Sequence, residues 1–268
     1  MTMIELLLVN AAILAAVMVA FWLISLKIDD VSFIDSVWGA GMALMAFVSW
    51  LHSGSPGALA DMIMVMAVVW GLRLAAHLFV RWRKDGEDPR YKRMLKKDRE
   101  AGHFARASLI KIFGMQAVLL FITCLPAQLG ILASAEPAPV TALAWAGLAL
   151  WLAGMFFEVV GDWQLKRFKA DPANEGKILD TGLWRYTRHP NYFGDACVWW
   201  GIWLAAASAG WDIALYSVIG PIFLTFTLTK WSGAALLESG MKKKRGDKYA
   251  DYIGRTSAFI PWPPKKSV

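Results

Sequence analysis

Seven long apolar stretches divide this chain and constrain its fold more than any other feature. A helix rises about 1.5 Å per residue, so about twenty apolar residues are needed to cross a bilayer. Inside the bilayer the backbone polar groups have no water to bind, and a helix satisfies them within one stretch. The predicted spans are Ile4 to Leu26, Phe33 to Leu51, Ala58 to Val80, Ser108 to Gly130, Val140 to Trp163, Tyr192 to Ala209 and Trp211 to Lys230.

The composition agrees with a membrane protein. Hydrophobic residues make up 57% of the 268 residues and charged residues 18%, which is too much apolar sequence for one soluble core. The sequence therefore predicts an all-α, polytopic membrane protein with a single domain, 1–268. Its last part, 231–268, is expected to form a short cytoplasmic helix and a proline-rich strap that pack on the same domain.

Lysine and arginine are concentrated in alternate connections. The link from Arg81 to Arg106 holds ten basic residues, whereas the links His52 to Gly57 and Ser208 to Gly210 hold none. Because cytoplasmic loops carry the basic excess, we expect the N-terminus outside and the C-terminus in the cytoplasm. A basic surface of this kind attracts anionic lipid, so the net charge of +7 predicts contact with the bilayer and no nucleic acid.

Several common site types are not expected. Cys124 and Cys197 both lie in apolar sequence, and no paired-cysteine motif occurs, so we predict no disulfide and no metal. The segment Gly39-Ala40-Gly41 approaches a dinucleotide fingerprint, but it lies inside a span and follows no strand. Small residues at this position favour close packing between helices.

One polar stretch, Gly176 to Asp195, lies between two apolar segments. Its last eleven residues contain Arg185, Tyr186, Arg188, His189, Asn191, Tyr192 and Asp195. Pro190 disfavours helix at His189, so a helix is predicted to begin at Asn191 or Tyr192. The free N–H groups of that first turn could bind an anion such as phosphate. A basic loop at the membrane edge with a capped helix is the structural alternative.

Charged residues inside the spans are candidate site residues, because burying them in a bilayer is costly. Asp35 enters the second span, where a carboxyl group removed from water could be protonated and donate a hydrogen bond or a proton. Local capping, or pairing with Ser32 or a basic loop residue, is the alternative. Arg73 and His77 share one face of the third span and could line a cavity or neutralise a buried acid.

Two acidic residues lie one turn apart near the end of the fifth span. Glu158 and Asp162 could accept hydrogen bonds from ribose hydroxyls or a carboxamide, while Lys166 and Lys169 on the same face take phosphates. An ion-pair ladder at the membrane edge would use the same spacing.

Two further segments could complete such a site. The loop from Arg81 to Tyr91 also contains Arg90, and it suits anion binding with an aromatic ring beside it. In the tail, a short helix containing Tyr252 and Arg255 precedes the strap. A loop that is basic only because it faces the cytoplasm would look similar.

The run from Gly182 to Asp195, GLWRYTRHPNYFGD, resembles the signature shared by the steroid 5-alpha reductase family and the sterol C14 reductases. The Glu158 to Asp162 spacing, the pattern from Tyr252 to Pro261 and the seven spans extend the resemblance over nearly the whole chain. The bacterial steroid 5-alpha reductase-like branch is the most similar. Isoprenylcysteine carboxyl methyltransferases carry a related Arg-His-Pro motif, but Gly194-Asp195 favours the reductases.

The resemblance implies reduction of an electron-poor C=C bond with NADPH, which would lie between cytoplasmic loops. Asn191 and Asp195 match positions at the nicotinamide end, Asp162 matches the family's acid, and Glu158 stands where the steroid enzymes have Asn. The implied phosphate residues are Arg81, Arg90, Lys166, Lys169, Arg188 and Arg255, and His189 belongs to the same motif. The implied cleft tyrosines are Tyr91, Tyr186, Tyr192 and Tyr252.

The substrate end of the site departs from the family pattern. The family binds the substrate ketone with a Gln-Glu dipeptide in the second span and a tyrosine in the third. Here Asp35-Ser36 stands at the dipeptide and Trp70 at the tyrosine. Asp35 is the expected catalytic residue, polarising the carbonyl of an enone such as a 3-oxo-4-ene steroid while hydride passes to the β-carbon.

Two other functions remain open. One is an S-adenosylmethionine-dependent membrane methyltransferase, and the other is a non-catalytic sterol- or lipid-binding membrane protein. For the reductase we expect a lipophilic substrate that enters from the membrane and no protein partner, so that a monomer suffices. The expected location is a bacterial inner membrane, with the cofactor site on the cytoplasmic side.

Overall fold

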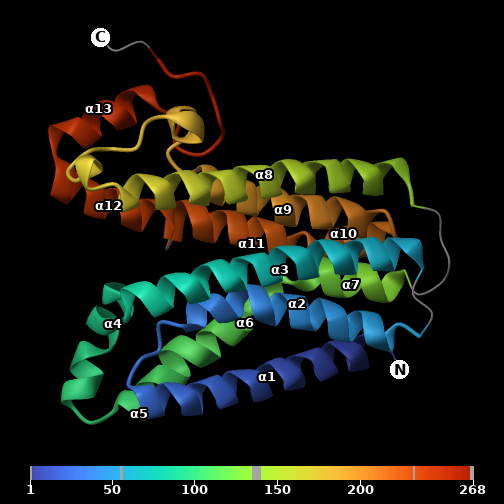
Figure 1. Cartoon of the computed structure of the whole chain (residues 1–268). Helices are drawn as coiled ribbons and strands as arrows, with labels where there is room; N and C mark the ends of the chain where they lie inside the picture. The colour runs from blue at the N-terminus through green and yellow to red at the C-terminus, as the bar shows by residue number, and fades with distance from the viewer. Residues whose placement is uncertain (1, 55–56, 135–139, 232, 266–268) are drawn as a thin grey trace. The chain divides into compact units, whose positions relative to one another are not determined.

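The computed structural model describes residues 2–54, 57–134, 140–231 and 233–265, and these residues form an all-helical protein with no strand (Figure 1). An isolated β-bridge joins Thr187 and Ser257. The chain divides into two compact units. Unit 1 comprises Met1–Ala144 and Ile202–Gly220, and unit 2 comprises Trp145–Gly201 and Pro221–Val268.

Unit 1 is a bundle of long helices and shorter connecting helices. Its elements are α1 (Met3–Ile28), α2 (Ile34–His52), α3 (Ala58–Asp85), α4 (Pro89–Glu100), α5 (Phe104–Ser108), the π-helix η1 (Leu109–Gly114), α6 (Met115–Thr123), α7 (Leu125–Ala133) and α10 (Trp211–Ser217). Helix α2 packs against α1, α3, α6 and α7 (Figure 1). It is therefore the central helix of this unit.

Glycines allow α2 and α3 to touch through their backbones. A Cβ atom on Gly39 would overlap the backbone oxygen of Gly71, and a Cβ on Gly71 would overlap that of Gly39. Small residues at such a contact let two helices approach closely. The packing role predicted for Gly39 is confirmed.

Unit 2 contains most of α8 (Ala142–Ala170) and the first part of α9 (Pro190–Ala207). The shorter elements of the unit are η2 (Pro172–Asn174), η3 (Gly182–Arg185), α11 (Ile219–Phe226), the π-helix η4 (Thr227–Trp231), α12 (Ala234–Arg245) and α13 (Asp247–Arg255). Helices α8 and α9 lie side by side in this unit, because a Cβ on Gly154 would lie 2.6 Å from Gly194 O and one on Gly201 2.6 Å from Gly147 O (Figure 1). Helix α9 begins at Pro190, close to the predicted start.

Six helical segments of the described residues, rather than the predicted seven, are long and apolar enough to cross a membrane. They are Met3–Ile28, Ile34–His52, Ala58–Asp85, Phe104–Thr123, Ala142–Ala170 and Trp211–Arg245. The expected span Tyr192 to Ala209 forms α9 but is not among them, and Asn191 and Asp195 lower the apolar content of its first turns. An integral membrane protein is supported, while the orientation of the termini stays a prediction.

The expected fourth span, Ser108 to Gly130, is not one continuous helix. It begins in a short α-helix and a π-helix and then divides into α6 and α7 around Cys124. Pro126 lies in the first turn of α7, where its missing N–H costs nothing. The candidate span at this place is Phe104–Thr123.

Candidate functional site

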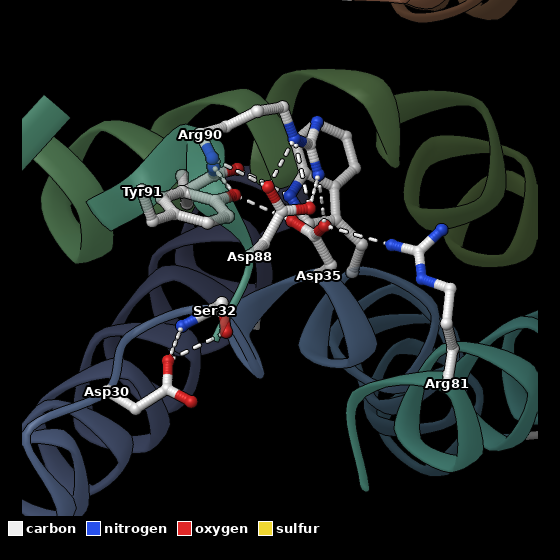
Figure 2. Close-up of polar contacts among 9 residues, drawn as sticks. Asp30, Ser32, Asp35, Arg81, Asp88, Arg90 and Tyr91 are labelled. Atoms are coloured by element: carbon white, nitrogen blue, oxygen red, sulfur yellow. Dashed lines mark hydrogen bonds and ion pairs between the residues drawn. The ribbon is translucent and has the colours of Figure 1, made fainter. Parts of the chain in front are cut away.

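Asp35 lies in the first turn of α2, after a tight turn that begins at Asp29. In that turn, Asp30 Oδ1 accepts hydrogen bonds from the N–H and the hydroxyl of Ser32, both at 2.7 Å. Trp82 Nε1 of α3 donates to the other oxygen of Asp30 at 2.7 Å. These contacts fix the chain immediately before Asp35, and Figure 2 shows those between Ser32 and Asp30.

Tyr91 is brought to Asp35 by the first turn of α4. Asp88 caps this helix by accepting from Arg90 N at 2.8 Å, and Pro89 occupies its first position. The Tyr91 hydroxyl then donates to Asp35 Oδ1 at 2.6 Å (Figure 2). Tyr91 is only 7% exposed. Burial, followed by the charge and hydrogen bond of Asp35, raises the pKa of Tyr91, so the phenol stays protonated at neutral pH.

Two arginines hold the other oxygen of Asp35. Arg90 Nη2 lies 2.8 Å from Asp35 Oδ2, and Arg81 Nη2 lies 3.5 Å from the same atom (Figure 2). Arg90 also pairs with Asp88 at 2.9 Å. Burial works against the charge of Arg90, but Asp88 and Asp35 outweigh it and raise the pKa of Arg90. Asp35 thus accepts hydrogen bonds in this structure, and Tyr91 is the donor beside it.

A second donor reaches Tyr91 from α6. Gln116 Nε2 donates to the Tyr91 hydroxyl oxygen at 3.4 Å, and Gln116 Oε1 accepts a short hydrogen bond from Trp38 Nε1 of α2. The indole fixes which end of the amide faces Tyr91, because an indole nitrogen can only donate. The π-helix η1 ends two residues before Gln116, and π-helical turns are frequent at functional sites.

A pocket of about 130 Å³ lies against Asp35. Ser32, Leu78, Arg81 and Trp82 form part of its lining. The loop from Gly86 to Pro89 lines it as well. A ligand atom in this pocket would meet a carboxylate and a guanidinium group that are already paired with each other.

In the resemblance to the steroid 5-alpha reductase family, Trp70 stands where the steroid enzymes have a tyrosine. Trp70 is 1% exposed in α3. The tyrosine that contacts Asp35 comes from α4 instead, 56 residues further along the chain than Asp35. Tyr91 was expected to line a cofactor cleft, and the structure places it with the candidate catalytic residue.

In unit 2, buried polar groups meet where α8 and α9 pack together. Glu158 and Asp162 are both buried on α8. Asn191 Nδ2 of α9 donates to Asp162 Oδ1 at 3.0 Å. Gly161 permits this approach, since a Cβ at its position would lie 3.1 Å from Asn191 N. The sequence grouped these residues, and the structure joins Asp162 to Asn191 directly.

Arg188 and His189 hold the C-terminal part of unit 2 in place. Arg188 Nε lies 2.8 Å from Glu238 Oε1 of α12, and His189 Nε2 lies 3.0 Å from the same oxygen. Arg188 Nη1 donates to the carbonyl oxygens of Thr256 at 2.8 Å and Ile253 at 3.2 Å, at the end of α13. Arg188 was expected near phosphate, and here its donors are engaged within the protein.

The tail that follows α13 returns to the same motif. Arg188 N donates to Ser257 O at 2.9 Å, and Trp262 N donates to Tyr186 O at 3.0 Å. The Tyr252 hydroxyl donates to Trp184 O at 2.5 Å.

The side chains of other predicted cofactor residues are either bound to neighbouring residues or exposed. Arg255 pairs with Asp180 at 2.6 Å. The ring of Tyr192 stacks on His189 with centroids 5.5 Å apart. Lys166 and Lys169 are exposed along the last turns of α8, and Tyr186 is also exposed.

The predicted site residues therefore fall into two groups. Asp35, Arg81, Arg90 and Tyr91 belong to unit 1. The other predicted cofactor residues belong to unit 2. They are Glu158, Asp162, Lys166, Lys169, Tyr186, Arg188, His189, Asn191, Tyr192, Asp195, Tyr252 and Arg255.

Three residues with site contacts were missed from the sequence. Gln116 and Trp38 extend the hydrogen bonds of Tyr91, and Glu238 holds Arg188. Gln116 is one of two amides, with Gln128, in the apolar run from Ser108 to Gly130, and Glu238 is the one acid between Asp212 and Asp247. Isolated polar residues in such segments are a usable signal for buried partners.

The fold and these contacts define a helical membrane protein with a half-buried carboxylate–tyrosine pair in one unit and a half-buried carboxylate–amide pair in the other. The chain belongs to the family described as "Protein of unknown function (DUF1295)", whose model matches residues 21–256.

Curated relatives are named 3-oxo-5-alpha-steroid 4-dehydrogenase 1. The mouse protein is 34% identical over 118 residues, which are 43% of this chain and 41% of the mouse protein. The human protein is 33% identical over 89 residues, which are 33% of this chain and 31% of the human protein. These matches cover less than half of each relative, and no solved structure matches the chain. The resemblance to steroid 5-alpha reductases is confirmed.

Proposed function

We propose that this protein uses NADPH to reduce the C=C bond of a lipophilic enone, such as a 3-oxo-4-ene steroid. The substrate would enter from a bacterial inner membrane, and the cofactor would bind on the cytoplasmic side. The hydrogen bond from Tyr91 to Asp35 carries this proposal, because it holds the protonated phenol of a buried tyrosine against a half-buried carboxyl group. The names of the curated relatives support the choice of an enone steroid.

In this proposal Tyr91 polarises the carbonyl of the enone. A carbonyl oxygen that reaches Tyr91 would accept its hydroxyl hydrogen, which is now donated to Asp35. Such a hydrogen bond stabilises the negative charge that develops on oxygen when the β-carbon receives hydride. The resulting enolate then takes a proton at its α-carbon, which gives the saturated ketone. Arg90, which already lies 2.8 Å from Asp35 Oδ2, would balance the carboxylate during this change.

Asp35 has two possible parts in this chemistry. As a carboxylate it would orient the Tyr91 hydroxyl, because both of its oxygens accept hydrogen bonds in the contacts described above. Protonated, it could instead donate directly to the carbonyl, which is the role expected from the sequence. The two roles differ in what removal of the Tyr91 hydroxyl would do.

The residues of unit 2 suit an NADPH molecule. Asp162 and Asn191 offer a buried acceptor and a donor for ribose hydroxyls or the carboxamide, with Glu158 one turn from Asp162. Lys166 and Lys169 are exposed and would bind phosphates. When bound, NADPH supplies the hydride from C4 of its nicotinamide ring. Tyr186, Tyr192 and Tyr252 would line the cofactor cleft, with Asp195 at the nicotinamide end.

Thermal unfolding of the detergent-solubilised protein with NADPH, NADH or S-adenosylmethionine tests this assignment. A ligand that binds only the folded protein raises its unfolding temperature. We expect the largest rise with NADPH, and we expect Lys169→Gln to reduce it. The matched control Lys177→Gln, at another exposed lysine of unit 2, should keep the full rise. A rise in the unfolding temperature with S-adenosylmethionine alone would contradict the reductase assignment and favour a methyltransferase.

A further inference from the structure

An apolar stripe runs along one face of α8. Its members Trp145, Leu152, Phe156, Val159 and Trp163 are all more than 40% exposed. Their spacing of seven, four, three and four residues places them on one side of a helix. Eighteen residues separate the two tryptophans, which at about 1.5 Å per residue is about 27 Å. This is close to the thickness of the bilayer's hydrocarbon core.

If the stripe faces lipid, this spacing would put one tryptophan at each surface of the hydrocarbon core, where aromatic belts occur in membrane proteins. The exposed stripe between them would face lipid chains. Anything that directly follows Trp163 on the same face would lie at the depth of the lipid headgroups. The residue one turn beyond Trp163 is Arg167.

A pocket of about 270 Å³ occupies this depth in unit 2. Trp163, Phe168 and Leu179 provide apolar lining, and the polar lining consists of Gln164, Arg167, Asp171, Asn174 and Thr181. The pocket is therefore continuous with the apolar stripe through Trp163.

Arg167 is the one cation among the described residues that line this pocket. Its guanidinium carbon lies 5.5 Å from the centre of the Trp163 ring. Stacking on a ring face leaves the N–H groups at the edge of a guanidinium available for phosphate oxygens. Asp171, one turn away, does not pair with Arg167 in the described structure, because its carboxylate accepts from Ala173 N at 2.9 Å and Asn174 Nδ2 at 3.4 Å.

We propose that this pocket binds the phosphate-bearing headgroup of a membrane phospholipid, with Arg167 on the phosphate and the acyl chains along the α8 stripe. The apolar stripe favours a lipid over free phosphate, since a soluble phosphate would gain nothing from Phe156 or Val159. The proposal stands apart from the reductase site, because the pocket lining includes neither Asp162 nor Asn191.

Native mass spectrometry of the delipidated full chain with added phosphatidylglycerol or phosphatidylethanolamine tests this proposal. Losing one charge-assisted hydrogen bond costs about 1.5–3 kcal/mol, so Arg167→Gln should weaken phospholipid binding by about tenfold or more. Trp163→Leu, which keeps an apolar side chain but removes the ring under Arg167, should weaken it less. The matched control Arg185→Gln removes the same charge from another exposed arginine of unit 2 and should bind lipid like the parent.

Three results would overturn the lipid site. Equal losses in Arg167→Gln and Arg185→Gln would mean that only general surface charge attracts lipid. Glycerol phosphate binding as tightly as the phospholipids would mean that the pocket recognises free phosphate. Displacement of the phospholipid by NADPH would place the pocket within the cofactor site. None of these outcomes depends on whether the protein reduces an enone.

Discussion

The hydroxyl of Tyr91 donates a 2.6 Å hydrogen bond to Asp35 Oδ1, although 56 residues separate the two along the chain. The contact joins the first turn of α4 to the first turn of α2. It gives the site a protonated donor whose position is set by a carboxylate, and the carboxylate is held in turn by Arg90 at 2.8 Å. The proposed polarisation of an enone depends on this pair.

Removing the Tyr91 hydroxyl should abolish most of the turnover. A positioned acid or oxyanion donor contributes about 10²–10³-fold to rate, so we expect Tyr91→Phe to lower kcat with an enone steroid by that factor. NADPH should still raise the unfolding temperature. Tyr249→Phe, which also removes the hydroxyl of a buried tyrosine, should turn over like the parent. Full activity in Tyr91→Phe would instead favour direct donation by Asp35.

Gln116 should act as a positioning residue for Tyr91. Gln116→Leu removes a 3.4 Å donor to the Tyr91 oxygen, and we expect kcat to fall by about tenfold, the value of one neutral hydrogen bond. The KM for NADPH should not change. Trp38→Phe, which frees the amide to turn, should give a smaller fall in the same direction. A changed KM for NADPH with unchanged kcat would contradict this role.

Asp88 should make stability depend on pH in the acidic range. Burial raises its pKa, but the hydrogen bonds and charge of Arg90 outweigh burial and lower it. An acid whose pKa is lowered by folding stabilises the protein fully above its unfolded pKa of about 3.9, and loses that contribution as the pH falls toward the folded pKa.

Asp88→Ala should therefore cost about 1 kcal/mol of unfolding free energy at pH 7, as expected for a lost helix cap, and less at pH 3. Denaturant unfolding in detergent at both pH values measures this difference. Asp85→Ala removes an exposed acid at the end of α3 and should cost nothing at either pH. An equal cost of Asp88→Ala at both pH values would contradict the assigned pKa.

Arg188 should affect stability more than cofactor binding. Arg188→Lys loses the two-point contact with Glu238 and the bonds to the end of α13, and each lost hydrogen bond to a charged group costs about 1.5–3 kcal/mol. Glu238→Gln should lower the unfolding temperature in the same way. Lys169→Gln should show the opposite pattern, with weaker NADPH binding and unchanged unfolding. If Arg188→Lys binds NADPH more weakly but keeps the stability of the parent, the result would favour a phosphate-binding role for Arg188.

The lengths of the apolar stretches and the small residues between helices were enough to predict much of the fold. The first three predicted spans match α1, α2 and α3 within a few residues at most ends, because each is a continuous apolar run. The fourth span was wrong as a single helix, since Pro126 and the π-helix η1 interrupt it. The sixth predicted span was not confirmed. Asn191 and Asp195 make the first turns of α9 less apolar, and Asn191 forms a polar contact there.

The site was predictable in its residue types and less so in its contacts. Helical spacing placed Glu158 and Asp162 on one face of α8, where both are buried. The resemblance put Asn191 in the same site, and Asn191 donates to Asp162. The contact of Tyr91 with Asp35 depends on how α4 turns back toward α2, and no local pattern encodes that path. The engagement of Arg188 with Glu238 likewise depends on α12, which lies 50 residues further along the chain.

The most direct test of the central claim is to follow the hydride from NADPH into the product. The purified protein is incubated with a 3-oxo-4-ene steroid and NADPH in which both hydrogens at C4 of the nicotinamide are replaced by deuterium, and the product is analysed by mass spectrometry. We predict a saturated ketone with one deuterium at the former β-carbon, and little of it with Tyr91→Phe. A product with its C=C bond intact and its carbonyl reduced, or no deuterated product at all, would contradict the account.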